Sequence, residues 1–288
     1  NSLSNPQDSD DPIRRQALWF NGTDSAACTA VFDSYYDTAN ASYLGDIELG
    51  FRSFTVEMWV RPEVVDRAQV LLERSFVYDS SDLGVTNEVV RHNYRIGIAT
   101  NGCVYASFDN AGSHDSHTGT EIIYGRALTA NKWVHIAARR SGFEHTFSLF
   151  VNGERQESKG SDLIPANGIL TIRDYPNQGA HVLYQSGVMV MGAALNQLTK
   201  TIMGIKFFNE VSLQNWQDYN QFYQGWIDEV RIWDGARPET EIQDDYKKRF
   251  TYDDLIANRA KIAAEVTTGY TRDVSNTKQL DSVLMHHY

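Results

Sequence analysis

The sequence has few cysteines and no long hydrophobic run. Its 288 residues include two cysteines, Cys28 and Cys103, which could be two buried thiols or a single disulfide. No run of apolar residues approaches the length of about 18 that a membrane-spanning helix needs, so we expect no membrane insertion. The chain begins with Asn rather than Met and shows no signal peptide, so we expect a processed product or an excised segment.

The chain also lacks an excess of positive charge. Its 26 Lys and Arg residues are outnumbered by 37 Asp and Glu residues, and the formal net charge is −11. Nucleic acids and anionic membrane surfaces attract basic proteins, so neither is an expected partner. An acidic protein is, however, compatible with a bound divalent cation.

Common catalytic motifs are missing as well. The sequence contains no Gly-x-Ser-x-Gly, no His-Glu-x-x-His, no P-loop and no dinucleotide-binding fingerprint. The motifs therefore give no reason to predict an enzyme.

What the sequence does have is abundant apolar and aromatic residues, arranged with a period of two. Hydrophobic residues make up 42% of the chain and aromatic residues 12%, which is enough for one large core. Residues 226–233 alternate in two registers, with Trp226, Asp228, Val230 and Ile232 on one side and Ile227, Glu229, Arg231 and Trp233 on the other. Large apolar groups on both sides predict an interior strand of a two-layer sandwich.

Other segments show the same strand pattern. Strands are predicted at 16–20, 54–62, 70–74, 94–99, 104–108, 132–140, 146–151, 169–172 and 188–192, with a loop over 75–93. Asn-Gly pairs at 101–102 and 152–153 predict hairpin turns. Helices are expected over 237–246, where Pro and Glu suit the first turn, and over 250–268. The predicted fold class is all-β, a two-layer antiparallel jelly-roll sandwich with short C-terminal helices.

Several of these segments resemble one known family. They are Ala-Leu-Trp-Phe-Asn-Gly-Thr-Asp at 17–24, Phe-Thr-Val-Glu-Met-Trp-Val at 54–60, Trp-Val-His-Ile-Ala at 133–137 with Phe-Ser-Leu-Phe-Val-Asn-Gly at 147–153, and the strand at 226–233. Together they are similar to laminin-G-like (LamG-like) jelly-roll domains of the concanavalin A-like lectin/glucanase superfamily. The resemblance covers residues 16–249, with 1–15 as a polar lead or linker and 250–288 as a helical extension or linker toward a following module. It implies an extracellular or cell-surface location.

The resemblance also implies a structural Ca²⁺ ion. In this superfamily an Asp of the last core strand and the turn after the first strand often supply the oxygen ligands that calcium prefers. The matching residues here are Asp228 on the strand, with Asn21, Gly22 and Asp24 in the turn. The alternative is that Asp228 accepts hydrogen bonds from the turn amides without any metal.

Hydrolytic chemistry is not predicted. The glucanase branch of the superfamily uses two Glu residues from one strand, near a Glu-x-Asp-x-(x)-Glu motif. The most similar fragment in this chain is Asp46-Ile47-Glu48, and Leu44 stands where the first Glu should be. We therefore predict that the protein is not an enzyme.

Two polar residues of the predicted core strands have structural interpretations. Glu57 and Arg231 lie in strands that the family places side by side, so they are predicted to form a buried ion pair. His135 is predicted to be a hydrogen-bonded interior residue rather than a ligand or a base.

Ligand contacts are predicted at loops on the rim of the sandwich, because rigid scaffolds often present function on loops. One candidate group is polar: Asp109, Asn110, His114, Asp115 and His117. It is either a binding loop, where the two histidines could also hold a transition metal, or a solvated loop. The other group is aromatic: Trp216, Tyr219 and Tyr223. These rings either stack on sugars or pack the 195–223 insertion onto the sandwich.

The sequence thus predicts a non-catalytic extracellular binding or adhesion module for glycan or protein ligands. The alternative is a structural spacer or self-assembly subunit of a larger surface protein, contacting its own copies or tandem neighbouring domains. Asn21 and Asn40 each begin an N-glycosylation sequon, which matters only if the chain is secreted through a glycosylating pathway.

Overall fold

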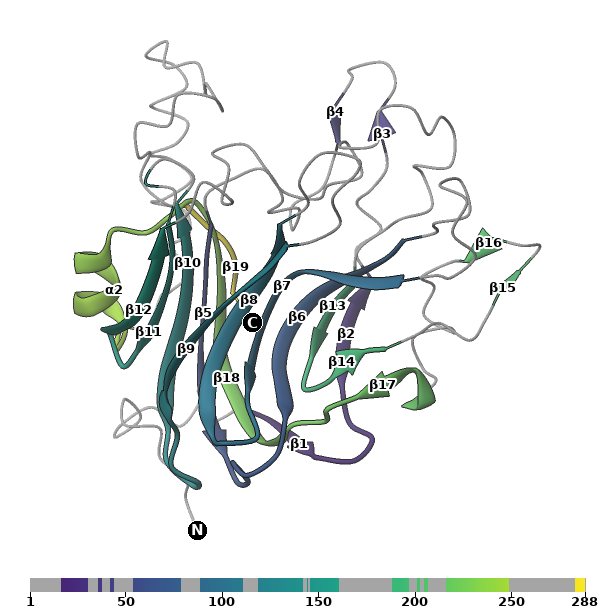
Figure 1. The fold of residues 1–288 in the computed structure, drawn as a ribbon, viewed down its shortest axis with the longest axis horizontal. Coiled ribbons are helices and arrows are strands. Elements are labelled where there is room, and N and C mark those ends of the chain that lie inside the picture. The colour runs from purple at the N-terminus through teal and green to yellow at the C-terminus, as the bar shows by residue number, and fades with distance from the viewer. Residues whose placement is uncertain are drawn as a thin grey trace.

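Two antiparallel β-sheets stacked face to face form the body of the molecule (Figure 1). The computed structural model describes residues 17–30, 36–37, 42–43, 54–78, 89–110, 119–141, 144, 146–160, 188–196, 201–202, 205–206, 216–248 and 283–287. The predicted class, an all-β antiparallel sandwich, is confirmed.

The larger sheet has seven strands in the order β1-β18-β5-β10-β11-β12, with β19 also paired to β18. We call it the large sheet. Its strands are β1 (Leu18–Asn21), β5 (Phe54–Pro62), β10 (Val134–Ser141), β11 (Thr146–Val151), β12 (Glu154–Gly160), β18 (Gln224–Asp234) and β19 (Val283–His287).

The other sheet has six strands in the order β2-β13-β6-β7-β8-β9, and we call it the small sheet. Its strands are β2 (Ala27–Ala30), β6 (Gln69–Tyr78), β7 (Val89–Ile98), β8 (Cys103–Asn110), β9 (Gly119–Ala127) and β13 (Val188–Met191).

Short elements accompany the two sheets. They are β3 (Tyr36–Asp37) with β4 (Ser42–Tyr43), β14 (Ala194–Leu195) with β17 (Tyr219–Asn220), β15 (Thr201–Ile202) with β16 (Ile205–Lys206), the 3₁₀ turn η4 (Trp216–Asp218) and the helix α2 (Glu239–Asp245). The helix predicted over 237–246 is therefore confirmed. Among the described residues no helix has the length and apolar character that a bilayer crossing requires.

The core lies between the sheets because every second residue of the central strands points inward. In β5 these residues are Phe54, Val56, Met58 and Val60, all fully buried. They join one apolar cluster with Ile96 of β7 and other residues of the small sheet. The intervening residues of β5 point to the outer face of the large sheet, where α2 packs Ile242 against Ala137 and Phe150.

The central strand β18 contains a bulge that the sequence pattern does not reveal. Its pairing with β5 shifts register between Asp228 and Arg231, and Glu229 has a positive φ of 51°. One extra residue reverses the alternation, so Ile227 and Val230 both face the core. The prediction of a central strand is confirmed, but the two predicted faces are wrong beyond residue 228.

Several strand boundaries differ from the predicted ones. The strands β6 and β7 extend into the segment 75–93 that was predicted as a loop. The strands β9 and β12 were not predicted. In β12 the sequence Glu-Arg-Gln-Glu-Ser-Lys-Gly is almost wholly exposed, so it has no apolar face to give a period of two.

Both predicted Asn-Gly turns are present. Asn152 and Gly153 have φ values of 53° and 76°, the left-handed pair that a tight hairpin needs. Gly102 has a φ of 80°, and its N–H donates to the carbonyl of Ala99.

The last described strand returns to the sandwich. Residues of β19 pair with Arg231–Asp234 of β18, next to the stretch of β18 that pairs with β1. That 250–288 leads toward a following module stays a prediction. The predicted strand at 169–172 and the predicted helix over 250–268 lie outside the described residues.

The two cysteines lie on separate strands of the small sheet. Cys28 is on β2 and Cys103 on β8, with β13, β6 and β7 between them. At the usual spacing of about 4.8 Å between neighbouring strands, these backbones are about 19 Å apart. Cys103 is a free, partly exposed thiol, so the disulfide alternative does not hold.

Candidate functional site

The outer face of the small sheet carries two rows of side chains that run across the strands. In one row Gly97 of β7 pairs with Tyr105 of β8, and Tyr105 pairs with Tyr124 of β9. In the other row, Glu73, Arg95, Ser107 and Ile122 are successive partners on β6, β7, β8 and β9. These residues point outward because their chain neighbours, such as Ile96 and Val104, belong to the core. We call this surface the tyrosine face.

A glycine makes room for one of the tyrosine rings. A Cβ at Gly97 would lie 2.6 Å from the Tyr105 hydroxyl and 2.7 Å from its Cε1. Tyr105 therefore lies across the backbone of β7, over a position with no side chain. Its ring centroid is 6.3 Å from that of Tyr124, in a tilted arrangement.

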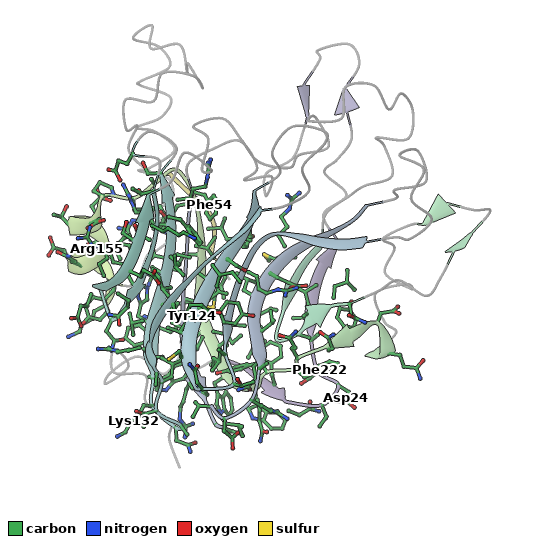
Figure 2. The ribbon with its side chains drawn as sticks, viewed as in Figure 1. Asp24, Phe54, Tyr124, Lys132, Arg155 and Phe222 are labelled. Carbon is green, nitrogen blue, oxygen red and sulfur yellow. The ribbon has the colours of Figure 1, made fainter. Side chains whose placement is uncertain are left out.

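The second ring and its neighbour are open to solvent. Tyr124, labelled in Figure 2, is 50% exposed and Ile122 is 39% exposed. An exposed ring beside a partly buried one is an apolar platform with a polar hydroxyl at its edge, the kind of surface that tyrosine gives to binding sites.

The ion pair between Arg95 and Glu73 lies beside the tyrosine rings. Arg95 Nε lies 2.6 Å from Glu73 Oε2, and the carboxylate is fully buried. The other carboxylate oxygen accepts a 2.6 Å hydrogen bond from the backbone N–H of Leu195. The pair is thus fixed in place and carries no net charge.

The electrostatics keep the Tyr105 hydroxyl protonated. Burial raises the pKa of Tyr105, and the Glu73 carboxylate adds to that rise while Arg95 opposes it. The hydroxyl can therefore donate and accept hydrogen bonds at neutral pH.

The edge of the tyrosine face is held by the other sheet. The backbone N–H of Tyr124 donates to Glu157 Oε2 at 2.7 Å, and that of Arg126 donates to Gln156 Oε1 at 3.2 Å. Both acceptors are side chains of β12, the edge strand of the large sheet. The outermost strand of the face is therefore fixed in place rather than a loose sheet edge.

Chemically, this arrangement suits binding. Rings can stack on a ligand, while Tyr105 and Arg95 offer hydrogen-bonding groups at fixed positions. In the described part of the chain no three His, Cys, Asp or Glu side chains come together as a metal site would require.

Two of the three aromatic residues predicted to bind a ligand, Tyr219 and Tyr223, are buried. Tyr223 is fully buried and Tyr219 is 7% exposed, so neither presents a ring to a sugar. Tyr223 packs against Phe20 at 6.1 Å, and its hydroxyl donates to the Trp226 carbonyl. The alternative, that these rings pack the insertion onto the sandwich, holds for both. Trp216 begins η4, and its side chain lies outside the description.

The predicted polar loop is described only at its start. Asp109 and Asn110 are the last residues of β8, and Asp109 follows Ser107 of the tyrosine face by two positions. His114, Asp115 and His117 lie outside the described residues. Their proposed contact with a ligand stays a prediction.

The residues predicted to hold calcium do not form one site. Asn21 pairs with Gln224 at the start of β18, whereas Asp228 lies four residues further along that strand, or about 13 Å at the usual rise per residue. Asp228 Oδ1 accepts a hydrogen bond from the N–H of Glu229, within the bulge.

The turn after β1 satisfies its own polar groups instead. Asn21 Oδ1 accepts hydrogen bonds from the N–H groups of Thr23, Asp24 and Ser25 and from the Ser25 hydroxyl. Gly22 has the positive φ of 80° that the turn needs. The Asn21 oxygen is thus committed to the turn, so Asn21, Gly22, Asp24 and Asp228 do not fit a calcium ion.

A second polar cluster lies on the outer face of the large sheet, under α2. Arg231 Nη1 is 3.9 Å from Glu57 Oε2, which confirms the predicted buried pair. Shorter contacts reach Glu57 from Arg237 Nη1 at 2.8 Å and from His135 Nε2 at 3.1 Å. Sequence reasoning missed Arg237 because it follows the strand, beyond the turn at Gly235.

The contacts in this cluster keep the Glu57 carboxylate ionised and the His135 imidazole neutral. Burial acts to raise the pKa of Glu57, but the hydrogen bond to His135 and the charges of Arg237 and Arg231 outweigh it and lower that pKa to about 2. Burial lowers the pKa of His135, so the imidazole is neutral at neutral pH. As predicted, His135 is an interior residue, and the cluster fixes α2 to the sheet without facing solvent.

Comparisons with solved structures find similar folds. A carbohydrate-binding module (CBM40) of the Ruminococcus gnavus IT-sialidase, bound to alpha2,6 sialyllactose, is 12% identical, with a TM-score of 0.49 over 79% of this chain and 95% of that one. The heptameric SAP-like pentraxin of Limulus polyphemus is 12% identical, with a TM-score of 0.40 over 68% and 70%. Domain 4 of the Geobacillus stearothermophilus arabinanase AbnA is 15% identical, with a TM-score of 0.40 over 79% and 75%.

Comparison with the sequences of curated proteins finds no match. The fold places the chain among the jelly-roll β-sandwich domains. The sequence profile of the concanavalin A-like lectin/glucanases superfamily, the Laminin_G_3 family, matches residues 33–182. The chain belongs to this family, as the LamG-like motifs of the sequence predicted.

Proposed function

We propose that this domain is a non-catalytic carbohydrate-binding module that holds its ligand on the tyrosine face. The observation that carries the proposal is the seating of Tyr105 over Gly97, beside the exposed ring of Tyr124. The Tyr105 ring, the exposed Tyr124 ring and the neighbouring Arg95–Glu73 pair together supply both stacking and hydrogen bonding. Membership of a lectin/glucanase superfamily agrees with this use of a sheet face.

The charges on this face favour an uncharged sugar. Arg95 is neutralised by Glu73 at 2.6 Å, so it is a hydrogen-bond donor rather than an anion receptor. The chain as a whole carries a net charge of −11, which repels acidic ligands at long range. A neutral pyranose with an apolar face is the ligand that these groups match best.

The absence of catalysis is part of the proposal. Glycoside hydrolysis usually needs two carboxyl groups on either side of the scissile bond, about 5–10 Å apart. Glu73 is fully buried and both its oxygens are engaged, by Arg95 and by Leu195, so it is poorly placed to protonate or attack a sugar.

Secretion to the cell surface is also proposed, on the family resemblance alone.

A titration of neutral glycans against variants of the tyrosine face tests the proposal. Tyr124→Ala should weaken binding at least five-fold, the equivalent of losing about 1 kcal/mol of stacking energy. Tyr124→Phe should retain most of the affinity, since it keeps the ring. Lys132→Ala, an exposed residue outside the tyrosine face, is the matched control.

Paired glycans with and without a terminal sialic acid test the charge argument in the same titration. The neutral member should bind more tightly. Wild-type affinity in Tyr124→Ala, or no binding of any neutral glycan, would overturn the proposal.

A further inference from the structure

A second aromatic row crosses the outer face of the large sheet. Trp19 of β1 pairs with Trp226 of β18, and Trp226 pairs with Arg61 of β5. All three point away from the core, because their chain neighbours Phe20 and Ile227 are core residues. We call these three residues the tryptophan row. It lies on the opposite side of the sandwich from the tyrosine face.

The row presents an open indole surface. Trp19 is 51% exposed, although β1 is paired with β18 along its whole length. The centroids of the Trp19 and Trp226 rings are 6.5 Å apart, with 50° between the ring planes. Two neighbouring rings, one of them half exposed, offer an apolar surface on which one face of a flat or chair-shaped ligand can stack.

A guanidinium group is held beside the rings. Arg61 Nε and Nη2 donate to the carbonyl and side-chain oxygens of Asn131, both at 3.4 Å. Asn131 is itself fixed, since it has a φ of 61° and its N–H donates to the Pro62 carbonyl. In the described part of the chain the Arg61 guanidinium has Asn131 as its acceptor, which leaves further guanidinium N–H groups for ligand hydroxyls.

The size of the row favours a small ligand over a protein partner. Among the described residues, Leu18 and Trp19 are the large apolar side chains of the large sheet that are exposed. A half-exposed Trp offers on the order of 130 Å², whereas each side of a stable protein interface buries about 800 Å². One sugar ring covers an area comparable to that of the row.

We propose that the tryptophan row is a second, independent platform for an uncharged sugar ring. Trp19 and Trp226 stack on the apolar face of the sugar, and Arg61 donates to its hydroxyl groups. The assignment rests on the geometry of this row and does not require the tyrosine face to bind.

A bivalent domain follows if the proposed function of the tyrosine face also holds. The two sheets lie about 10 Å apart, and the two platforms face away from each other. A single short oligosaccharide cannot reach both, so each domain would join two separate glycan chains. Joining chains in this way raises avidity without any new contact, as an adhesion module requires.

Isothermal titration with a neutral disaccharide, together with agglutination of beads coated with the same sugar, tests the proposal. The wild-type protein should bind two equivalents of sugar and agglutinate the beads. Trp19→Ala and Tyr124→Ala should each leave one equivalent bound with wild-type affinity, weaken the other site at least five-fold and lose agglutination. The double variant should be weakened at both sites. Trp19→Phe should keep most of the second site.

Two controls separate binding from folding. Leu18→Ser removes a neighbouring exposed apolar side chain that is outside the row, and it should leave the stoichiometry at two. Thermal unfolding should be nearly unchanged in Trp19→Ala, because that side chain is half exposed.

The outcomes distinguish the two platforms. One equivalent in the wild type, unaffected by Trp19→Ala, would overturn the second platform and leave the tyrosine face standing. Binding abolished by Trp19→Ala alone, with Tyr124→Ala unaffected, would overturn the tyrosine face instead. No binding of the sugar to any variant would overturn both.

Discussion

Arg237 Nη1 lies 2.8 Å from Glu57 Oε1, and both side chains are almost completely buried. This ion pair joins the middle of β5 to the segment that leads into α2. Arg237 also forms an ion pair with Asp245 at the C-terminal end of α2, with 2.8 Å between Nη2 and Oδ2. The Cζ atom of its guanidinium lies 4.2 Å from the centre of the Trp233 ring. One buried arginine thus links the sheet to both ends of the short helix, in addition to the packing of Ile242 against Ala137 and Phe150.

Loss of Arg237 should be severely destabilising. Arg237→Ala leaves the buried Glu57 carboxylate without its shortest charge partner, and breaking such a pair typically costs about 3–5 kcal/mol. Urea unfolding measures the change. Arg155→Ala is the control, because Arg155 forms an exposed pair with Glu239 at 3.1 Å and such pairs contribute about 1 kcal/mol or less. Equal losses in the two variants would contradict the role given to Arg237.

Glu57 should make the protein acid-sensitive at low pH. Its pKa is lowered from 4.5 to about 2 on folding, so the unfolded chain takes up the proton first as the pH falls. The stabilisation is therefore complete above about pH 5 and is lost as the pH falls toward 2, a change of about 3 kcal/mol. Glu57→Gln should flatten the stability curve over this range, measured by urea unfolding at successive pH values.

His135 should also make the folded protein less stable as the pH falls, but in a higher pH range than Glu57. Burial lowers its pKa below 6.5, so the unfolded state binds the proton first and stability falls as the pH drops below about 6.5. His135→Gln should flatten the curve between that value and the onset of the Glu57 effect. An unchanged slope there would show that His135 keeps an ordinary pKa in the folded protein.

The sequence predicts the scaffold better than the site. Phe54–Pro62 and Thr146–Val151 were predicted with the bounds they have, because each alternates clearly between apolar and other residues. The bulge in β18 could not be predicted, because both of its faces carry large apolar groups and neither register is visibly wrong. Glu229 gives no sign of a left-handed residue, as Gly or Asn would.

The tyrosine face was missed for a related reason. Its exposed ring is on β9, where two adjacent isoleucines and two flanking glycines hide the period of two. Gly97 was the available signal, since a glycine within a predicted strand often marks a close approach. The aromatic residues of 216–223 attracted the prediction instead, because composition shows that rings are present but does not show which way they point.

The turn after β1 provides a test for calcium. Asn21→Ala should cost about 1–2 kcal/mol, as the loss of a side-chain cap does, because several turn donors lose their acceptor. If the turn is self-sufficient, the cost measured by thermal unfolding is the same in calcium and in EDTA. A wild-type melting point that falls in EDTA, with a smaller cost of Asn21→Ala, would restore a metal to this turn.

Cys103 should react as a free thiol. It is partly exposed on β8, and Cys28 lies on β2, which is separated from β8 by three other strands of the small sheet. Alkylation of the folded, non-reduced protein should therefore modify Cys103, and Cys103→Ser should leave the melting point unchanged. Resistance to alkylation until a reductant is added would indicate a disulfide.

Gly97→Ala should weaken sugar binding without touching a residue that contacts the ligand. The new Cβ would lie 2.6 Å from the Tyr105 hydroxyl and 2.5 Å from the Gln69 carbonyl oxygen, so the ring must leave its seat and the backbone must shift. We expect a lower melting point and a several-fold loss of affinity at the tyrosine face, with the tryptophan row unaffected. A double-mutant cycle with Tyr105→Ala isolates the effect of the ring, since Gly97→Ala should cost little further affinity once that ring is gone. Wild-type affinity in Gly97→Ala would mean that the position of the Tyr105 ring over Gly97 does not contribute to sugar binding.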